Sequence, residues 1–228
     1  MKKLIIFTGA GISAESGLKT FRDTNGLWEG FDVHEVATPR AWQKNPELVL
    51  RFYNERRQNV KEAKPNKAHE IIAELEQYFD VHVITQNIDD LHERAGSKNI
   101  MHLHGDIFKM RSEQNDEVIY PISGDINVGD NAPDGFQLRP HIVWFEEPVP
   151  MMDDALMLAS QADIFVVIGT SLVVYPAASI VNYVAPSIPV LVVDKKVPKV
   201  NRNDVTYIEK PATEGMEELK NILLEKYI

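Results

Sequence analysis

The chain alternates short apolar runs with longer segments in which apolar residues recur every three or four positions. The runs are nearly continuous, which is typical of strands buried on both faces of a parallel sheet. We expect strands at 3–7, 81–85, 100–103, 163–169 and 189–194, and a weaker one at 205–209. The helical spacing predicts helices at 46–60, 66–78, 151–161, 177–183 and 213–226. Asn66 is the expected N-cap of the second of these helices and Thr213 that of the last. The alternating strands and helices predict an α/β fold, a Rossmann-like parallel sheet with helices on both faces.

Two stretches interrupt this alternation. Residues 18–45 are rich in Gly, Asp, Thr and aromatic residues, and residues 106–140 are polar with several Gly and Pro. Loops of this length are usually functional or form an inserted unit. We therefore expect one domain over 1–228, with a small inserted subdomain at about 18–62 and 106–140.

The composition excludes several classes. The 228 residues contain no Cys, which excludes disulfides, thiolate metal sites and a Cys nucleophile. A formal charge of −10 argues against non-specific nucleic-acid or anionic-membrane binding. The longest apolar run, 164–169, is far shorter than the roughly 20 residues of a bilayer-spanning helix. The basic pair and four apolar residues at the start lack a cleavage-like region. We expect a soluble, cytoplasmic protein, with a monomer as the default.

A glycine-rich turn follows the first expected strand. Residues 8–14, TGAGISA, fit the G-x-G-x-x-G/A pattern, in which glycines let the backbone approach a pyrophosphate. Such turns also occur as purely structural connections. No helix leading to a second strand with a terminal acid follows Gly17, so we expect the loop to fold over a cofactor.

Several further segments extend this turn into a longer set of motifs. They are GAGISAESG (9–17), TFRD (20–23), GLW (26–28), TQNIDDLH (85–92), LHG (103–105), LRPHIVWF (138–145) and GTSLVVYPA (169–177). In content and in order they closely resemble the sirtuin family. The resemblance implies NAD as a consumed co-substrate and acyl-lysine proteins or peptides as partners. It implies NAD contacts at Gly9, Ala10, Gly11, Ile12, Ala14, Thr20, Phe21, Arg22, Trp28, Gln86, Asn87, Ile88, Asp89, Gly169, Thr170, Ser171, Asp194 and Ala212.

Three residues at strand ends are the candidate catalytic groups. Asn87 and Asp89 follow the 81–85 strand, and the resemblance assigns them to the nicotinamide ribose and carboxamide. An acid there could also simply cap the next helix. His104 suits a general base, because histidine titrates near neutrality. The residues alone leave His92 and His102 equally available, and only the match to the His-Gly motif selects His104.

Residues at other strand ends also match the sirtuin family, with one difference at Asp194. Gly169, Thr170 and Ser171 could hold a phosphate or the adenosine ribose, although a small-residue turn is also common there. Asp194 stands where the family usually has Asn, and Ala212 where it packs against adenine.

One segment matches the part of the sirtuin sequence that binds the peptide substrate. Val143, Trp144 and Phe145 match the strand that pairs with an extended peptide, and Glu146 replaces the family's usual Gly. That replacement leaves the peptide preference open.

A basic pair points to an acidic acyl group. Tyr53 and Arg56 share a face of the 46–60 helix and, with Ala37, resemble sirtuins that prefer succinyl-, malonyl- or glutaryl-lysine. A guanidinium can hold a carboxylate with two hydrogen bonds, and a small Ala leaves room for a longer chain. The alternative is a solvated basic face, since Arg51 and Arg57 flank the pair.

The zinc module of the family has no ligands here. Ser112 and Asn115 occupy the positions of the first Cys pair, and no His lies between His104 and His141. The 125–130 stretch superficially resembles a calcium loop but lacks its spacing and final Glu. We expect no bound metal.

The main hypothesis is an NAD-dependent protein-lysine deacylase that accepts succinyl- or malonyl-lysine as well as, or in preference to, acetyl-lysine. An ADP-ribosyltransferase, an NAD hydrolase and a catalytically weak NAD-sensing module stay open as alternatives.

Overall fold

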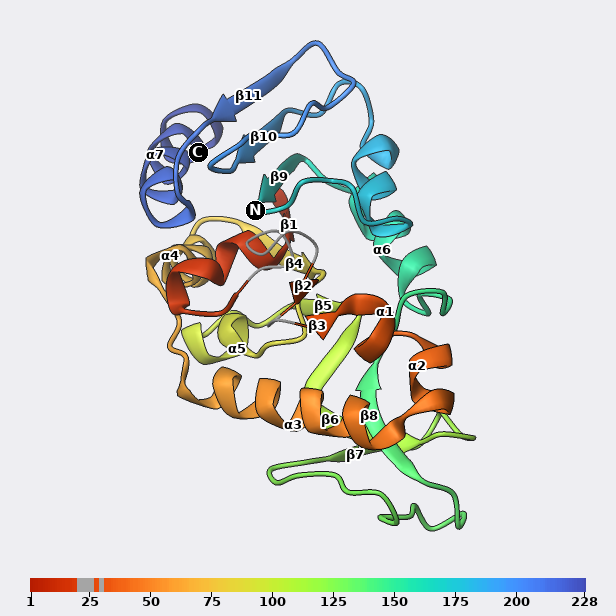
Figure 1. Cartoon of the computed structure of the whole chain (residues 1–228). Helices are drawn as coiled ribbons and strands as arrows, with labels where there is room; N and C mark the ends of the chain where they lie inside the picture. The colour runs from red at the N-terminus through yellow and green to blue at the C-terminus, as the bar shows by residue number, and fades with distance from the viewer. Residues whose placement is uncertain (20–26, 29–30) are drawn as a thin grey trace.

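A computed structural model describes residues 1–19, 27–28 and 31–228. Its main sheet is parallel, in the order β11-β10-β9-β1-β4-β5 (Figure 1). The strands are β1 (Lys3–Thr8), β4 (Asp80–Thr85), β5 (Ile100–His102), β9 (Ile164–Ile168), β10 (Val190–Val193) and β11 (Val205–Ile208). The six predicted strands are all present, each within one residue of its predicted ends. The predicted Rossmann-like class is therefore confirmed.

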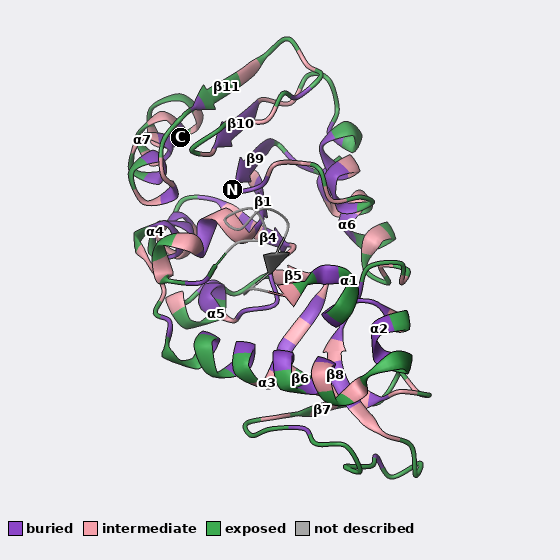
Figure 2. Cartoon of the chain, viewed as in Figure 1, coloured by how far each residue is buried: buried purple, intermediate pink, exposed green. Residues whose placement is uncertain are grey.

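Helices cover both faces of this sheet. Leu4 and Ile6 of β1 pack toward α4 (Lys67–Leu75) and α7 (Ala212–Tyr227). Ile5 and Phe7 pack toward α6 (Met152–Ser160) and the 3₁₀ helix η3 (Ala177–Tyr183). All four side chains are completely buried, and β9 and β10 are coloured as buried in Figure 2. Burial on both faces explains why the runs are continuous rather than alternating.

One of the two predicted caps is right and the other is wrong. The Asn66 side chain accepts a hydrogen bond from Ala68 N at 3.0 Å and begins α4, as predicted. Thr213 is not an N-cap, because α7 already begins at Ala212. Thr213 N instead donates to Glu15 Oε2 at 3.0 Å. A carboxylate from a distant loop thus satisfies a helix-start donor that local sequence alone would leave to a cap.

A second, smaller layer lies beside the carboxyl edge of the sheet. Its antiparallel strands β6 (Gly105–Ser112), β7 (Ile119–Pro121) and β8 (Leu138–Ile142) pack with α1 (Val33–Val36), α2 (Pro39–Lys44) and α3 (Pro46–Glu62). These elements share an apolar cluster that includes Trp42, Phe52 and Ile107. The expected inserted subdomain stays a prediction, but this cluster supports it. The remaining short elements are η1 (Ala10–Ile12), η2 (Ala14–Ser16), β2 (Leu27–Trp28), β3 (Phe31–Asp32) and α5 (Leu91–Ala95).

Two side chains of α3 attach the long 113–137 segment to this layer. Asn54 donates to Ile126 O at 2.9 Å and accepts from Ile126 N at 3.1 Å. Arg57, only 1% exposed, donates to Ile107 O at 2.8 Å, to Gly124 O at 3.2 Å and to Asn54 Oδ1 at 2.8 Å. We call Asn54 and Arg57 the polar clamp. It links the segment to α3 through three hydrogen bonds that need no metal, two to Ile126 and one to Gly124 O. Two further bonds of Arg57, to Ile107 O of β6 and to Asn54, hold the clamp itself in place.

The residues that the structure describes contain no group of three or more His, Cys, Asp or Glu placed to hold a metal ion. None of their helices has the length and apolar character required to cross a bilayer.

Replacing Asn54 with Ala tests the clamp. The substitution removes both hydrogen bonds to Ile126 and one partner of the buried Arg57, so we expect a loss of about 1–3 kcal/mol in unfolding free energy. Denaturant unfolding measures it, and limited proteolysis should cut the 113–137 segment faster. Arg51→Ala, exposed on the same helix, is the control. EDTA should leave the wild-type melting temperature unchanged; a fall would show that a metal holds this layer.

Candidate active site

The candidate site is built around a close backbone contact between the ends of β1 and β9. These two strands are neighbours at the centre of the sheet. From β1 the next strands, β4 and β5, are added on one side, and β9, β10 and β11 are added on the other. Open α/β sheets usually bind ligands at the carboxyl ends of the strands where the order reverses in this way. Gly11 N donates to Gly169 O at 2.8 Å, and Gly9 N donates to Ile168 O at 3.0 Å. A Cβ at Gly11 would lie 2.7 Å from Gly169 Cα, and Gly169 has a φ of +62°. The backbone packing therefore requires both glycines.

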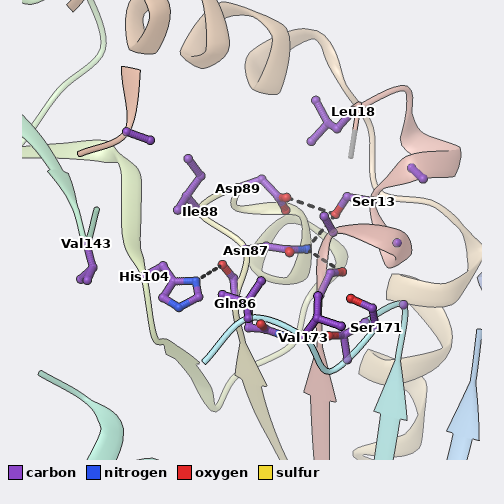
Figure 3. A pocket seen from close by; sticks show the side chains of 18 of the residues that line it. Ser13, Leu18, Gln86, Asn87, Ile88, Asp89, His104, Val143, Ser171 and Val173 are labelled. Carbon is purple, nitrogen blue, oxygen red and sulfur yellow. Dashed lines mark hydrogen bonds between the residues drawn. The ribbon is translucent and has the colours of Figure 1, made fainter. Parts of the chain in front are cut away.

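Three buried polar side chains meet beside this turn (Figure 3). Asn87 Nδ2 donates to Ser13 Oγ and to Gly9 O, both at 3.2 Å, and Ser13 Oγ donates to Asp89 Oδ2 at 3.1 Å. Burial raises the pKa of Asp89, opposed by its hydrogen bonds from Leu91 N and Ser13 and by the charges of Arg56 and His102. The network holds an amide and a carboxyl group in fixed positions at the cavity wall.

His104 presents one ring nitrogen to the same cavity. Its Nδ1 lies 2.9 Å from Gln86 O, a pure acceptor, so Nδ1 carries the proton and Nε2 is left with its lone pair. Burial lowers the pKa of His104, although the hydrogen bond to Gln86 opposes this, and the neutral form therefore prevails at pH 7. A neutral imidazole with an open Nε2 is suited to accept a proton.

Most of the predicted residues come together around one cavity of about 420 Å³. The cavity is lined by the predicted residues Gly9, Ala10, Gly11, Ala14, Ala37, Tyr53, Arg56, Gln86, Asn87, Ile88, Asp89, His104, Val143, Trp144, Phe145, Gly169, Thr170, Ser171, Asp194 and Ala212. Ile12 does not line it, because its side chain is completely buried in the core beneath. Thr20, Phe21 and Arg22 lie outside the described residues, as does the side chain of Trp28.

The end of the cavity where the sequence predicts the acyl-lysine joins the two layers. Tyr53 and Arg56 project from α3 and are 0% and 5% exposed, so they are not part of a solvated basic face. Burial raises the pKa of Tyr53, which therefore stays a neutral hydrogen-bond donor. Val143 N donates to His104 O at 2.9 Å and Phe145 N to Ala37 O at 3.0 Å. This wall is thus connected directly to the candidate base and to Ala37.

Glu146, which stands where the family usually has Gly, adopts a φ of +74°. Its carboxylate accepts from Arg40 of α2, with Arg40 Nε 3.1 Å from Glu146 Oε2. The hydrogen bond to Arg40 lowers the pKa of Glu146. The ion pair offsets part of the cost of the left-handed conformation.

Sequence reasoning missed several lining residues. Ser13 lies inside the glycine motif, between Gly11 and Ala14. Its place in that motif was the sequence signal that could have predicted it at the cavity. Ile142, Val173 and Val174 likewise lie inside the quoted motifs 138–145 and 169–177. The remaining residues lie outside the quoted motifs, and tertiary packing brings them to the cavity: Leu18, Lys19, Glu147, Val149, Lys195 and Lys196.

Comparison with known proteins identifies the family. The model of the Sir2 family matches residues 9–176. The chain belongs to the Sir2 family, the sirtuins. It is 50% identical over 226 residues to an NAD-dependent protein deacylase of Helicobacter pylori (strain ATCC 700392 / 26695), covering 99% of each chain. It is 49% identical over 231 residues to a Bacteroides thetaiotaomicron protein of the same name, covering 98% of this chain and 99% of the relative. A solved Sir2 homologue–NAD complex has a TM-score of 0.88 and 38% identity, covering 98% of this chain and 90% of that one.

The residues of this sirtuin fit NAD. Glycine backbone lines the cavity at the sheet edge, where a Cβ would collide with the neighbouring turn, and hydrogen-bonding groups line the rest of the cavity between the two layers. Asp194 lies at the end of β10 and Ala212 at the start of α7, on the side expected for adenosine. Asp194 Oδ1 accepts from Lys196 N at 2.8 Å, which holds the carboxylate in this sirtuin in place of the family's usual amide.

Gly11→Ala tests whether the close approach is needed for the cofactor. The added Cβ meets backbone that cannot rotate away, so the turn must shift at a cost of about 1–3 kcal/mol. We expect NAD affinity, measured by calorimetry, to fall about five- to 100-fold. Gly124→Ala is the control, since a Cβ there meets nothing within 4 Å. Unchanged affinity in Gly11→Ala would contradict the proposed role of the turn.

Proposed function

We propose that this sirtuin is an NAD-dependent protein-lysine deacylase that transfers the acyl group of a modified lysine to ADP-ribose and releases nicotinamide. The observation that carries the proposal is the placement of His104 Nε2 and the Asn87–Ser13–Asp89 network in one cavity with the glycine turn. The names of the relatives agree with it.

Bound NAD would supply a ribose carbon from which nicotinamide departs, with positive charge developing on the ribose. In the proposed site, Asn87 orients the nicotinamide ribose and Asp89 the carboxamide. A buried polar network can do this without reorganising, since its groups are already held in place. His104 Nε2 then accepts a proton from a ribose hydroxyl, while Gln86 O holds the other ring nitrogen.

We further propose that the acyl-lysine enters as an extended peptide along Val143–Phe145. The hydrogen bonds from Val143 N to His104 O and from Phe145 N to Ala37 O support that position, because a peptide along this wall would lie next to both the candidate base and Ala37.

Nicotinamide release with matched acetyl-, succinyl- and unmodified lysine peptides tests the function. Release that requires an acyl-lysine is expected. Release independent of acylation would favour NAD hydrolysis or ADP-ribosyl transfer, and NAD binding without release would favour the NAD-sensing alternative.

His104→Ala should lower deacylation at least about 100-fold, which is the usual size of a general-base contribution. NAD binding should stay measurable, because the Asn87–Ser13–Asp89 network does not include His104. His82→Ala, on β4 and outside the cavity lining, is the control. Retained turnover in His104→Ala would remove this residue from the mechanism.

The proposed preference for an acidic acyl group rests on the buried charge of Arg56. Arg56 is buried and lines the cavity together with Tyr53 and Ala37, and its charge opposes the rise that burial causes in the pKa of Asp89. A buried cation in a pocket favours an anionic ligand, since a neutral acyl chain would leave that charge less well compensated. We propose that succinyl- and malonyl-lysine are preferred to acetyl-lysine.

Arg56→Met tests this preference. Loss of a charged hydrogen-bonding partner is worth about 1.5–3 kcal/mol, so kcat/KM for succinyl-lysine should fall about 10- to 150-fold. Acetyl-lysine turnover should change far less. Arg51→Met, exposed on the same helix, should leave both unchanged. Equal losses on the two peptides in Arg56→Met would make Arg56 a structural residue.

A further inference from the structure

His102 lies two residues before the candidate base, and its ring contacts the backbone of Asn87, which lines the cavity. Its Nδ1 is 2.9 Å from Asn87 O, and its Nε2 is 2.8 Å from Glu93 Oε1 of α5. The side chain is 14% exposed. The ring therefore connects the backbone of Asn87 to a carboxylate on the following helix.

Both partners of this ring accept hydrogen bonds. A carbonyl oxygen and an ionised carboxylate carry no proton, so the two contacts are both hydrogen bonds only when both ring nitrogens are protonated. A neutral ring would turn a nitrogen lone pair toward one of the oxygens. The geometry thus favours an imidazolium at His102, in contrast to His104, which has only one acceptor.

The hydrogen bond to Asn87 O is one of three to consecutive backbone carbonyls. Gln86 O accepts from His104 Nδ1, Asn87 O from His102 Nδ1, and Ile88 O from Ile107 N at 2.9 Å. One continuous segment, 102–107, therefore positions the three residues that precede Asp89.

The charged and titratable groups around His102 come from several elements. Glu93 is on α5, Asp106 is on β6 and itself pairs with Lys109 at 3.1 Å, and Asp89 is in the candidate site. Buried His92 on α5 also faces the ring, and its pKa lies well below 6.5 because of burial, so it stays neutral.

These neighbours decide the charge of His102. Burial alone would lower the pKa of His102, but Glu93, Asn87 O and Asp106 outweigh it and the pKa is raised above 6.5. Burial would raise the pKa of Glu93, and the hydrogen bond and charge of His102 bring it below its ordinary value instead.

We propose that His102, as an imidazolium paired with Glu93, is a positioning residue that fixes the Asn87 backbone for nicotinamide release. The inference rests on the proposed role of Asn87 in the deacylase. As pH rises through the raised pKa, His102 loses one donor and the positioning weakens. As pH falls through the lowered pKa of His104, which lies below 6.5, the ring becomes protonated and the base is lost. The two histidines thus predict opposite limbs of one pH–rate profile.

The test is the pH profile of kcat/KM for NAD in wild type, Glu93→Gln and His102→Gln, read as nicotinamide release with an acyl-lysine peptide. Glu93→Gln keeps an acceptor oxygen but removes the charge, so the alkaline limb should move about one pH unit lower. His102→Gln cannot titrate, so that limb should disappear. At pH 7 its kcat/KM should fall about three- to tenfold, the effect of one hydrogen bond. His82→Gln is the matched control, because it removes another His–carboxylate pair, to Asp80 at 3.1 Å, from the same sheet.

Titration of the His102 ring by NMR gives a readout that does not depend on activity. A ring pKa above 6.5 in wild type that falls in Glu93→Gln is expected. A ring that titrates at or below 6.5, or an alkaline limb unchanged in both variants, would overturn the proposal. A uniform loss of rate at every pH would assign His102 a merely structural role and overturn it as well. If wild type released no nicotinamide from any peptide, the deacylase proposal would fail, and pH-dependent NAD binding with the NMR titration would still decide the role of His102.

Discussion

The backbone contact between Gly11 and Gly169 is the constraint on which the rest of the site depends. It brings the ends of two adjacent parallel strands within 2.8 Å, N to O, at the point where the strand order reverses. Because no side chain fits between them, the turn after β1 can lie flat across the sheet edge. Ser13 then reaches Asn87 and Asp89, which follow the neighbouring parallel strand β4 at the same edge of the sheet. The polar network is a consequence of this packing.

The carboxyl edge of β4 and β5 has a second constraint of a different kind. The carbonyls of residues 86–88 are each bound by a donor from residues 102–107, and two of these donors are histidine rings. The partners of each ring decide its charge. His104 bonds to one carbonyl and remains neutral, while His102 bonds to a carbonyl and a carboxylate and favours the cation. Two identical side chains two residues apart thereby acquire opposite electrostatic characters.

In the smaller layer, the amino-acid composition of the chain bears directly on how the long 113–137 segment is held. The chain has no cysteine for the metal ligands of its family, and the 113–137 segment is attached to α3 through Asn54 and Arg57. A buried guanidinium bonded to two backbone carbonyls is a strong attachment, because each bond is charge-assisted and shielded from water. The same helix contributes Tyr53 and Arg56 to the cavity, so the clamp and the proposed acyl pocket share one rigid element.

The sequence by itself determined the parallel sheet, the glycine turn and the residues that match the family. Continuous apolar runs such as 164–168 can be buried on both faces only in that kind of sheet, and turn glycines have local backbone requirements. It could not determine that Glu15 rather than Thr213 satisfies the start of α7, or that Ile12 belongs to the core while Ser13 joins the site. It also left His92, His102 and His104 equivalent until a motif was matched. Tertiary structure separated them, because burial and hydrogen-bond partners from distant segments decide which neutral ring lines the cavity, which ring favours a cation and which is buried and neutral away from it.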